Sequence, residues 1–491
     1  MNSKLYYSLL FLGLFLFIDI GSFQACAQVV NKDKITTANS VGNSYSLSLE
    51  PVAIAGFAGL QSFAAAQLDG RWLLIGGRID GLHRMQPFAS FAESGNNTNI
   101  VVIDPEAKQS WNSKVSDLPP PLNEQLQSTN MEFIQRGKTL YLIGGFGYSK
   151  TAGNDVTHNK LTAVKVDCLI SAVQKGSSIA PCFRQISDSA FALTGGQIGR
   201  IGETFYLVGG QKFDGRYNPM GPDHGPGFSQ QYSNQIRRFR IKDDGVSLAA
   251  EILPGVTDQV NLHRRDFNLL PQVFPNNVPG FTVFSGVFQV GANLPYTNTV
   301  DLFADKHVVN SSFTQYLNHY HCAKVALYDS ENNKMENIFF GGISQYEENA
   351  GTPISNKDVP FTKAIAKVSR EKDGKMIETK IADLPEFLGA GAEFLINSNL
   401  PTIENEIVKI NEVKADRVLL GHIVGGIHST RKTVFFSNSG RESSASNSIY
   451  KVWLTRIPKQ NRKLLPRKLI IRTERYHHQL TTRPASILFL P

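Results

Sequence analysis

The chain is poor in cysteine and tryptophan, and it has one long apolar run. Its four cysteines and three tryptophans among 491 residues exclude a small scaffold that is held together by disulfides. After Ile18 no segment approaches the roughly 20 apolar residues that a membrane-spanning helix needs. We therefore expect no transmembrane segment.

Several catalytic signatures are also missing. The sequence contains no Gly-x-Ser-x-Gly nucleophile turn, no phosphate-binding loop and no His-Glu-x-x-His zinc motif. Sequence motifs therefore name no reaction.

The excess of positive charge is confined to one end of the chain. The formal net charge is +8, but the stretch from Lys459 to Pro491 holds eight basic residues and one acidic residue, so it carries +7 and the rest carries +1. No basic face is implied for the remainder, and we expect no nucleic-acid binding. We expect residues 458–491 to be a disordered basic tail, because charge runs are usually solvated. A basic arm for anionic surfaces is one alternative, and an altered reading frame after Ile457 is another.

A short apolar run that ends in a glycine pair, or in a close variant of one, recurs six times. These runs end at Gly77, Gly145, Gly210, Gly286, Gly342 and Gly426. An anchor leucine precedes each run, at Leu60, Leu126, Leu193, Leu262, Leu317 and Leu388, with spacings of 66, 67, 69, 55 and 71 residues. Such a period indicates a repeat architecture and is too long for a helical solenoid. The glycines permit sharp turns with positive φ and a close approach of neighbouring backbones. The sequence therefore predicts an all-β fold, a β-propeller with six four-stranded blades.

The first unit carries further landmarks. The strand Val101-Val102-Ile103-Asp104 is followed by Trp111 and then by Leu118-Pro119. Together with the glycine pairs, these residues resemble the kelch repeat, and the resemblance extends from about Leu60 to Leu454. It implies a divergent kelch-type propeller, because Ser285 replaces a glycine and most blades lack the tryptophan. Galactose oxidase-like proteins and the exported sialic-acid mutarotases share this kind of propeller.

The last blade lacks one strand in sequence order. Only one clear strand, Ile449 to Leu454, follows the last glycine pair. Tyr45, Leu47 and Leu49 alternate with serines and predict a strand that supplies the missing partner and closes the ring. We expect the propeller to span residues 44–457.

The N-terminus has the pattern of a targeting segment. Lys4 precedes an apolar stretch from Leu5 to Ile18, and Ala25-Cys26-Ala27 offers a cleavage site. Residues 1–27 are therefore expected to be a signal peptide, and the protein to be secreted, periplasmic or at the cell surface. Acylation of Cys26, as in a lipoprotein, is the alternative.

Export permits disulfides. Cys168 and Cys182 lie 14 residues apart in a region where we expect an outer hairpin. Pairing them would add about 3 kcal/mol to the stability by closing a loop.

Long segments follow four of the glycine pairs, at residues 78–98, 146–160, 211–235 and 343–360. Connections of this length in a compact domain are usually functional or disordered. In an antiparallel blade, the residues that follow each anchor leucine lie on the same face as these loops. We call this side the loop-bearing face.

The residues after the anchor leucines differ from blade to blade. Blades one, three and six have small or neutral residues there, whereas blades two, four and five have polar ones. The candidate ligand-binding residues are Gln127, Asn130, Glu132, His263, Arg264, Arg265, Asp266, His319, Tyr320 and His321. An arginine and a carboxylate beside aromatic side chains would suit a polar, sugar-like ligand. The alternative is structural, with Arg264 or Arg265 paired to Asp266 or Glu132 to tie blades together.

His319 and His321 are candidate ligands for a metal ion. Alternate positions on a strand point to the same side, so both imidazoles would reach one ion. Two ligands are an incomplete site, however, and the nearby Tyr316 and Cys322 do not match the copper motifs of the galactose-oxidase family residue by residue. We therefore expect no metal and no cofactor.

Together these features predict a monomeric, exported, kelch-like propeller that binds a glycan or an extracellular protein through its loop-bearing face. The competing class is a carbohydrate-active enzyme, either a sugar mutarotase or a copper oxidase. The fold by itself does not distinguish between them.

Overall fold

The computed structural model describes residues 44–221, 225, 227–349 and 351–458. The predicted signal peptide and the basic tail from Lys459 onward lie outside the described residues. Within the described part, no helix has the length and apolar character that crossing a membrane requires.

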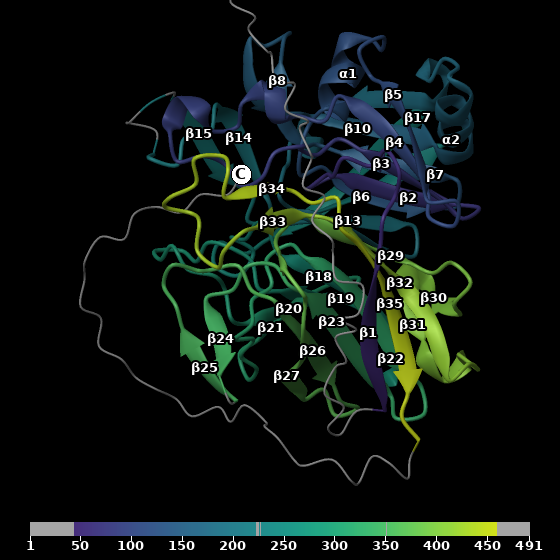
Figure 1. Ribbon diagram of the computed structural model, residues 1–491, viewed down its shortest axis with the longest axis vertical. Helices are drawn as coiled ribbons and strands as arrows, with labels where there is room; N and C mark the ends of the chain where they lie inside the picture. Colours follow the sequence, from purple (N-terminus) through teal and green to yellow (C-terminus); the bar gives the residue numbers. More distant parts are fainter. Residues whose placement is uncertain (1–43, 222–224, 226, 350, 459–491) are drawn as a thin grey trace, which may run out of the picture. The chain divides into compact units, whose positions relative to one another are not determined.

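Six antiparallel sheets follow one another along the chain (Figure 1), and we call them blades one to six. Blades one to three consist of β2 (Ala64–Leu68), β3 (Arg71–Ile75), β4 (Asn99–Asp104) and β5 (Gln109–Lys114); β6 (Glu132–Arg136), β7 (Thr139–Ile143), β10 (Lys160–Lys165) and β11 (Phe183–Ser187); and β12 (Gln197–Ile201), β13 (Thr204–Val208), β16 (Gln235–Asp243) and β17 (Leu248–Thr257).

Blades four to six are built in the same order. They consist of β18 (Asn268–Phe274), β19 (Val278–Phe284), β20 (Thr299–Leu302) and β21 (His307–Asn310); β22 (Ala323–Asp329), β23 (Lys334–Phe340), β26 (Ala364–Arg370) and β27 (Met376–Asp383); and β29 (Ala392–Ile396), β32 (Arg417–Gly425), β35 (Ile449–Arg456) and β1 (Tyr45–Val52). Two short strands, β31 (Ile407–Lys409) and β30 (Thr402–Ile403), extend blade five beside β22.

Apolar side chains fill the space between successive blades. Ile75 of blade one packs in one cluster with Leu142 of blade two, and Ile143 of blade two packs with Leu207 of blade three. The cluster that contains Val424 of blade six also contains side chains of blade one. Six four-stranded sheets that pack face to face in this way form a β-propeller, as the glycine and leucine spacing predicts.

The N-terminal strand joins the last blade. β1 pairs with β35 over eight residues, from Tyr45 opposite Arg456 to Val52 opposite Ile449. Its alternate side chains Tyr45, Leu47 and Leu49 are buried in the cluster between blades five and six. The predicted pairing of this strand with the last blade is confirmed.

The glycine pairs adopt positive φ and form the sharp turns that the sequence predicts. The departure at Ser285 is instructive, because this serine adopts the same left-handed conformation with φ of 57°. At Gly210 the backbone N–H donates to the carbonyl of Arg264, 2.7 Å away in the next blade.

The connections on the loop-bearing face form small sheets of their own. They are β8 (Phe146–Ser149), β9 (Asn154–Thr157), β14 (Gln211–Gly215) and β15 (Phe228–Tyr232) in one sheet; β24 (Tyr346–Asn349) and β25 (Thr352–Ser355) in a second; and β28 (Phe387–Leu388), β33 (Ile427–Ser429) and β34 (Ser443–Ala445) in a third. Figure 1 shows β14 and β15 side by side.

The outer connection of blade two differs from the predicted hairpin. It contains helix α2 (Val166–Lys175) and a single 3₁₀ turn, Ala180–Cys182, between β10 and β11. The apolar side of α2 packs into the cluster between blades one and two, which a bare hairpin would leave incomplete. Cys168 and Cys182 form the expected disulfide, with a Cα–Cα distance of 5.5 Å. The other α-helix, α1 (Pro120–Leu126), lies between blades one and two in sequence.

Candidate functional site

One residue of each blade takes a left-handed conformation just before the innermost strand. The φ angles are 54°, 51°, 67°, 52°, 27° and 77° at Ser62, Asn130, Gly195, Asp266, His321 and Gly391, respectively. Six backbone hydrogen bonds of 2.8–3.4 Å link these residues, and each N–H donates to the carbonyl of the preceding blade. The N–H of Ser62 donates to Gly391, so the series returns to its starting residue. We call these six residues the mouth circuit.

Side chains of the mouth circuit border a small cavity of about 40 Å³. Its lining includes Asn130, Asp266 and His321 from the circuit. Arg78 and His83 also line it, and they belong to residues 78–98, which we call the first loop. Because a water molecule needs roughly 10–15 Å³ in this measure, the cavity has room for about three waters. It has no room for a sugar.

The first loop covers this mouth cavity. The side-chain amide of Asn438 donates to the carbonyls of Leu82 and His83, at 2.5 and 2.9 Å. The backbone N–H of Leu82 donates to the hydroxyl of Ser443 at 2.9 Å. Segments from the first and last blades are thus fastened together over the mouth.

Arg265 is fully buried next to the mouth cavity. Its guanidinium pairs with Asp266 at 2.5 Å and donates through Nε to the Tyr232 hydroxyl at 3.3 Å. It also lies 5.4 Å from the centre of the Phe288 ring. In the described part of the chain, Nη2 of Arg265 and the hydroxyl of Tyr320 are both buried without a hydrogen-bond partner. Two buried hydrogen-bond donors, Nη2 of Arg265 and the hydroxyl of Tyr320, are therefore unsatisfied here.

A more open pocket lies on the same face, between the loops of blades three and four. Tyr232 and His263 stack with ring centres 3.9 Å apart and planes 21° apart. They line a pocket of about 260 Å³ with Phe288, Gln289 and the segment from Gly291 to Asn293. Nδ1 of His263 lies 2.8 Å from Oδ1 of Asn234, and burial lowers the pKa of this histidine. We call this cavity the aromatic pocket.

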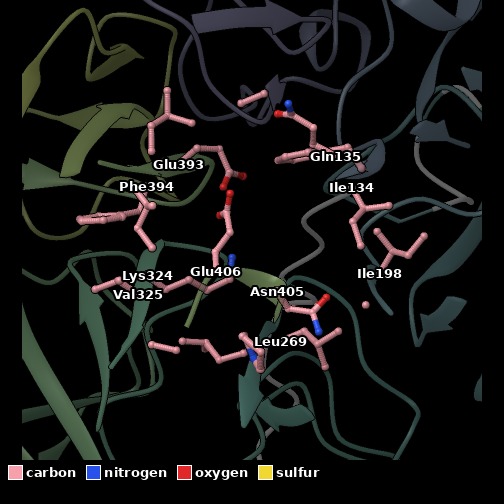
Figure 2. A pocket seen from close by; sticks show the side chains of 18 of the residues that line it. Ile134, Gln135, Ile198, Leu269, Lys324, Val325, Glu393, Phe394, Asn405 and Glu406 are labelled. Atoms are coloured by element: carbon pink, nitrogen blue, oxygen red, sulfur yellow. The ribbon is translucent and has the colours of Figure 1, made fainter. Parts of the chain in front are cut away.

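A third cavity, of about 290 Å³, is bordered by the innermost strand of every blade. Most of its wall is apolar, and Figure 2 shows Ile134, Ile198, Leu269 and Phe394 around it. Its polar side chains are Gln67, Gln135, Arg200, Lys324, Glu393, Asn405 and Glu406. We call it the channel cavity.

Comparisons with known proteins add no functional assignment. No family model matches the chain, and no curated protein matches it. Among solved structures, one described as "Structure of YjhT" is similar, with 10% sequence identity, a TM-score of 0.43, and coverage of 81% of this chain and 97% of that one.

The structure does not bring all the predicted residues to the mouth. Arg264 turns into its own blade, where Nη1 donates to the carbonyl of Ser285 at 2.9 Å and Nη2 donates to Oδ1 of Asn298 at 2.7 Å. It also lies 3.9 Å from the centre of the Tyr296 ring, and burial lowers its pKa to about 9. This arginine fixes a loop, and it does not line the mouth cavity, the aromatic pocket or the channel cavity.

His319 and His321 do not point to the same side, as the alternation of a strand would require. Both residues have positive φ and precede β22, so strand alternation does not apply to them. Nδ1 of His319 is 2.6 Å from the carbonyl of Gly341, and burial lowers the pKa of this histidine to about 4. Nε2 of His321 instead lies 3.5 Å from Glu393. The described residues include no group of three His, Cys, Asp or Glu side chains able to hold a metal ion.

The remaining predicted residues have structural contacts. Oε1 of Glu132 accepts from the N–H of Gly196 at 2.8 Å, which links blades two and three. Gln127 follows α1 and donates to Asn123. The ring of Tyr320 lies in an apolar cluster beneath the loops.

Sequence reasoning missed Phe288 and Gln289, which line the aromatic pocket. They follow the fourth glycine position, where the connection is too short to stand out among the long loops. It also missed Glu406, because this residue lies at the opposite end of the blades from the glycine pairs.

Proposed function

We propose that the protein is an exported binding protein whose aromatic pocket takes a sugar-like ligand. The observation that supports this most directly is the stacked pair Tyr232 and His263, which forms one wall of a pocket of about 260 Å³. A flat aromatic face buries the C–H face of a sugar ring, while a few polar groups bind its hydroxyls.

The polar groups near this wall suit a hydroxyl-rich ligand. Gln289 and Asn293 line the pocket, and Arg265 lies behind Phe288, outside the lining. Because Arg265 is fully buried and paired with Asp266, it adds no net charge beside the pocket, which suits a neutral ligand. A glycan is therefore favoured over a protein ligand.

A sugar mutarotase is the alternative, and it needs an acid and a base beside the ring. In the described lining of the aromatic pocket, the groups able to transfer a proton are His263 and Tyr232, whose rings stack on each other as one wall. This composition favours binding over catalysis.

The proposal is tested by glycan-array screening of the full chain, followed by calorimetric titration of the glycan that is retained. Tyr232→Ala removes the exposed wall, and we expect it to lower the affinity about tenfold or more, in line with the ~0.5–1.5 kcal/mol of an aromatic contact plus its buried area. Tyr346→Ala is the matched control, because Tyr346 is a loop tyrosine that packs edge-on against Tyr316 outside the pocket. We expect the control to retain the affinity within about twofold.

Two outcomes would contradict the proposal. One is that no glycan is retained, and the other is that Tyr232→Ala and Tyr346→Ala behave alike. If the bound sugar exchanges between anomers faster with the protein than without it, the mutarotase alternative holds instead.

A further inference from the structure

We infer that the channel cavity is a second ligand site, separate from the aromatic pocket, that takes a small organic amine with a short apolar body. This site lies among the innermost strands, whereas the aromatic pocket lies among the loops. The inference therefore does not depend on the proposed function.

The wall of the channel cavity suits an apolar body. Side chains from all six innermost strands surround about 290 Å³, among them Phe133, Ile198, Leu269, Val325 and Phe394. A cavity of this size with mainly apolar walls and a few convergent polar groups is typical of small-molecule sites.

Two carboxyl groups provide the charge. Figure 2 shows Glu393 and Glu406 with their carboxyl groups pointing toward one another inside the cavity. Glu393 is only 9% exposed, accepts no hydrogen bond from the described residues, and has Nε2 of His321 at 3.5 Å as its one ionic neighbour there. Two facing carboxylates repel one another when both are ionised, and a cation between them removes that repulsion.

Among the described residues, no lysine or arginine forms an ion pair with Glu393 or Glu406. Lys324 borders the same cavity, yet it makes no ion pair with either carboxylate in the described structure. Arg200 is also at the cavity, but its guanidinium pairs with Glu404 outside it. The charge of the two carboxylates is therefore left for a ligand to balance.

Glu406 is placed over the cavity by an unusual turn. The turn Glu404–Glu406 leaves β30, with φ of 62° at Asn405 and 64° at Glu406. Non-glycine residues adopt this conformation at a cost of roughly 1 kcal/mol or more each. The side-chain amide of Asn405 donates to the carbonyl of Arg200 at 2.9 Å, so the turn is tied to blade three. The turn joins β30 to β31, which extends blade five beside β22, and it places Glu406 at the cavity.

The surroundings of Glu406 agree with a cationic ligand. Glu406 is an exposed residue of the turn, and it also lines the cavity. The protein atoms around it nevertheless remove part of its hydration and raise its pKa, and a hydrogen bond from Gln67 opposes that shift. An ammonium group beside Glu406 would favour its ionised form.

An organic cation fits better than a metal ion. Calcium takes six to eight oxygen ligands at 2.3–2.6 Å, whereas this cavity offers two carboxylates and an apolar wall. A benzyl or short alkyl amine uses both features.

The experiment compares benzylamine with benzyl alcohol, which has the same apolar body without the charge. Binding to the full chain is measured by calorimetry near neutral pH. We expect one benzylamine per chain, bound at least about tenfold more tightly than benzyl alcohol. Glu406→Gln should lower the affinity for benzylamine about tenfold and leave that for benzyl alcohol unchanged.

Two further variants make the test specific. Glu412→Gln changes a carboxylate whose side chain is 54% exposed and which does not line the cavity, and we expect it to retain binding within about threefold. Ile198→Trp fills the cavity from β12 and should abolish binding of benzylamine.

The inference is overturned if benzylamine does not saturate a site, or if the alcohol binds as tightly as the amine. It is also overturned if Glu412→Gln weakens binding as much as Glu406→Gln does, or if Ile198→Trp leaves binding intact. None of these results bears on glycan binding in the aromatic pocket.

Discussion

Arg264, Arg265 and Asp266 are consecutive in the chain, yet each side chain has a different environment. Arg264 holds a loop of its own blade, Arg265 lies between Asp266 and the aromatic pocket, and Asp266 borders the mouth cavity. The left-handed φ of 52° at Asp266 redirects the chain at this point. Single residues of this segment therefore need to be tested separately.

Glu132 should make stability depend on pH. Burial raises its pKa to about 8 from an ordinary value of 4.5. Between these two pH values the folded protein binds more protons than the unfolded chain, so stability falls as the pH rises. Glu132→Gln keeps an acceptor for the N–H of Gly196 and does not ionise. We expect its melting temperature to vary less with pH, and to exceed that of the parent by several degrees near pH 8.

The control for this measurement is Glu203→Gln, since the side chain of Glu203 is 65% exposed. It should keep the pH slope of the parent. Part of the slope should also remain in Glu132→Gln, because burial raises the pKa of Glu378 to about 8 as well. Equal slopes in the parent and in Glu132→Gln would contradict the expectation.

Among the elements, the strand β1 joins segments from far apart in the chain. It is separated from β35 by almost the whole chain, yet the two pair over eight residues. Its buried residues contribute to the cluster between blades five and six. Stability of the last blade therefore depends on a strand from the other end of the protein.

Leu47→Ala tests this dependence. Leu47 is 2% exposed and lies opposite Leu454. Removing a buried leucine side chain costs about 2–5 kcal/mol, and we expect this loss in one cooperative urea transition of the whole propeller. Ser46→Ala, on the other face of the same strand, should change stability by less than about 0.5 kcal/mol. An early separate transition with the main one unchanged would show that β1 frays independently.

At the scale of the whole molecule, the blades were predictable and the arrangement of the site was not. Glycine pairs and leucines recur because every blade needs the same backbone turn and the same packing, so they leave a period in the sequence. Side-chain direction at His321 or Arg264 depends on the φ of one turn residue, which leaves no period. Helix α2 was missed because a single short amphipathic segment inside a long β repeat resembles an outer strand pair. The aromatic pocket combines loops of two blades, whose contact no local pattern encodes.

The mouth circuit should contribute to the stability of all six blades together. At Gly391, φ is 77°, and an added Cβ would lie 2.6 Å from the N atom of Ser62. Gly374 has a similar φ of 85° but open space around it. Both Gly→Ala changes carry the cost of a left-handed alanine, roughly 1–2 kcal/mol. We expect Gly391→Ala to lose at least about 2 kcal/mol more than Gly374→Ala in urea unfolding. Equal losses would mean that the circuit contributes little.

The mouth circuit also has an electrostatic consequence. All six N–H groups point the same way around it, each toward the preceding blade. Their peptide dipoles therefore run head to tail along a loop, and such bonds polarise one another. Dipoles that circulate in this way largely cancel along the axis of the loop, in contrast to those of a helix, which add up to a partial charge at each end. The hydrogen bonds of the circuit consequently give little preference for anions or cations, and a preference for charge at the mouth comes from side chains of its lining such as Asp266, Arg78 and His321.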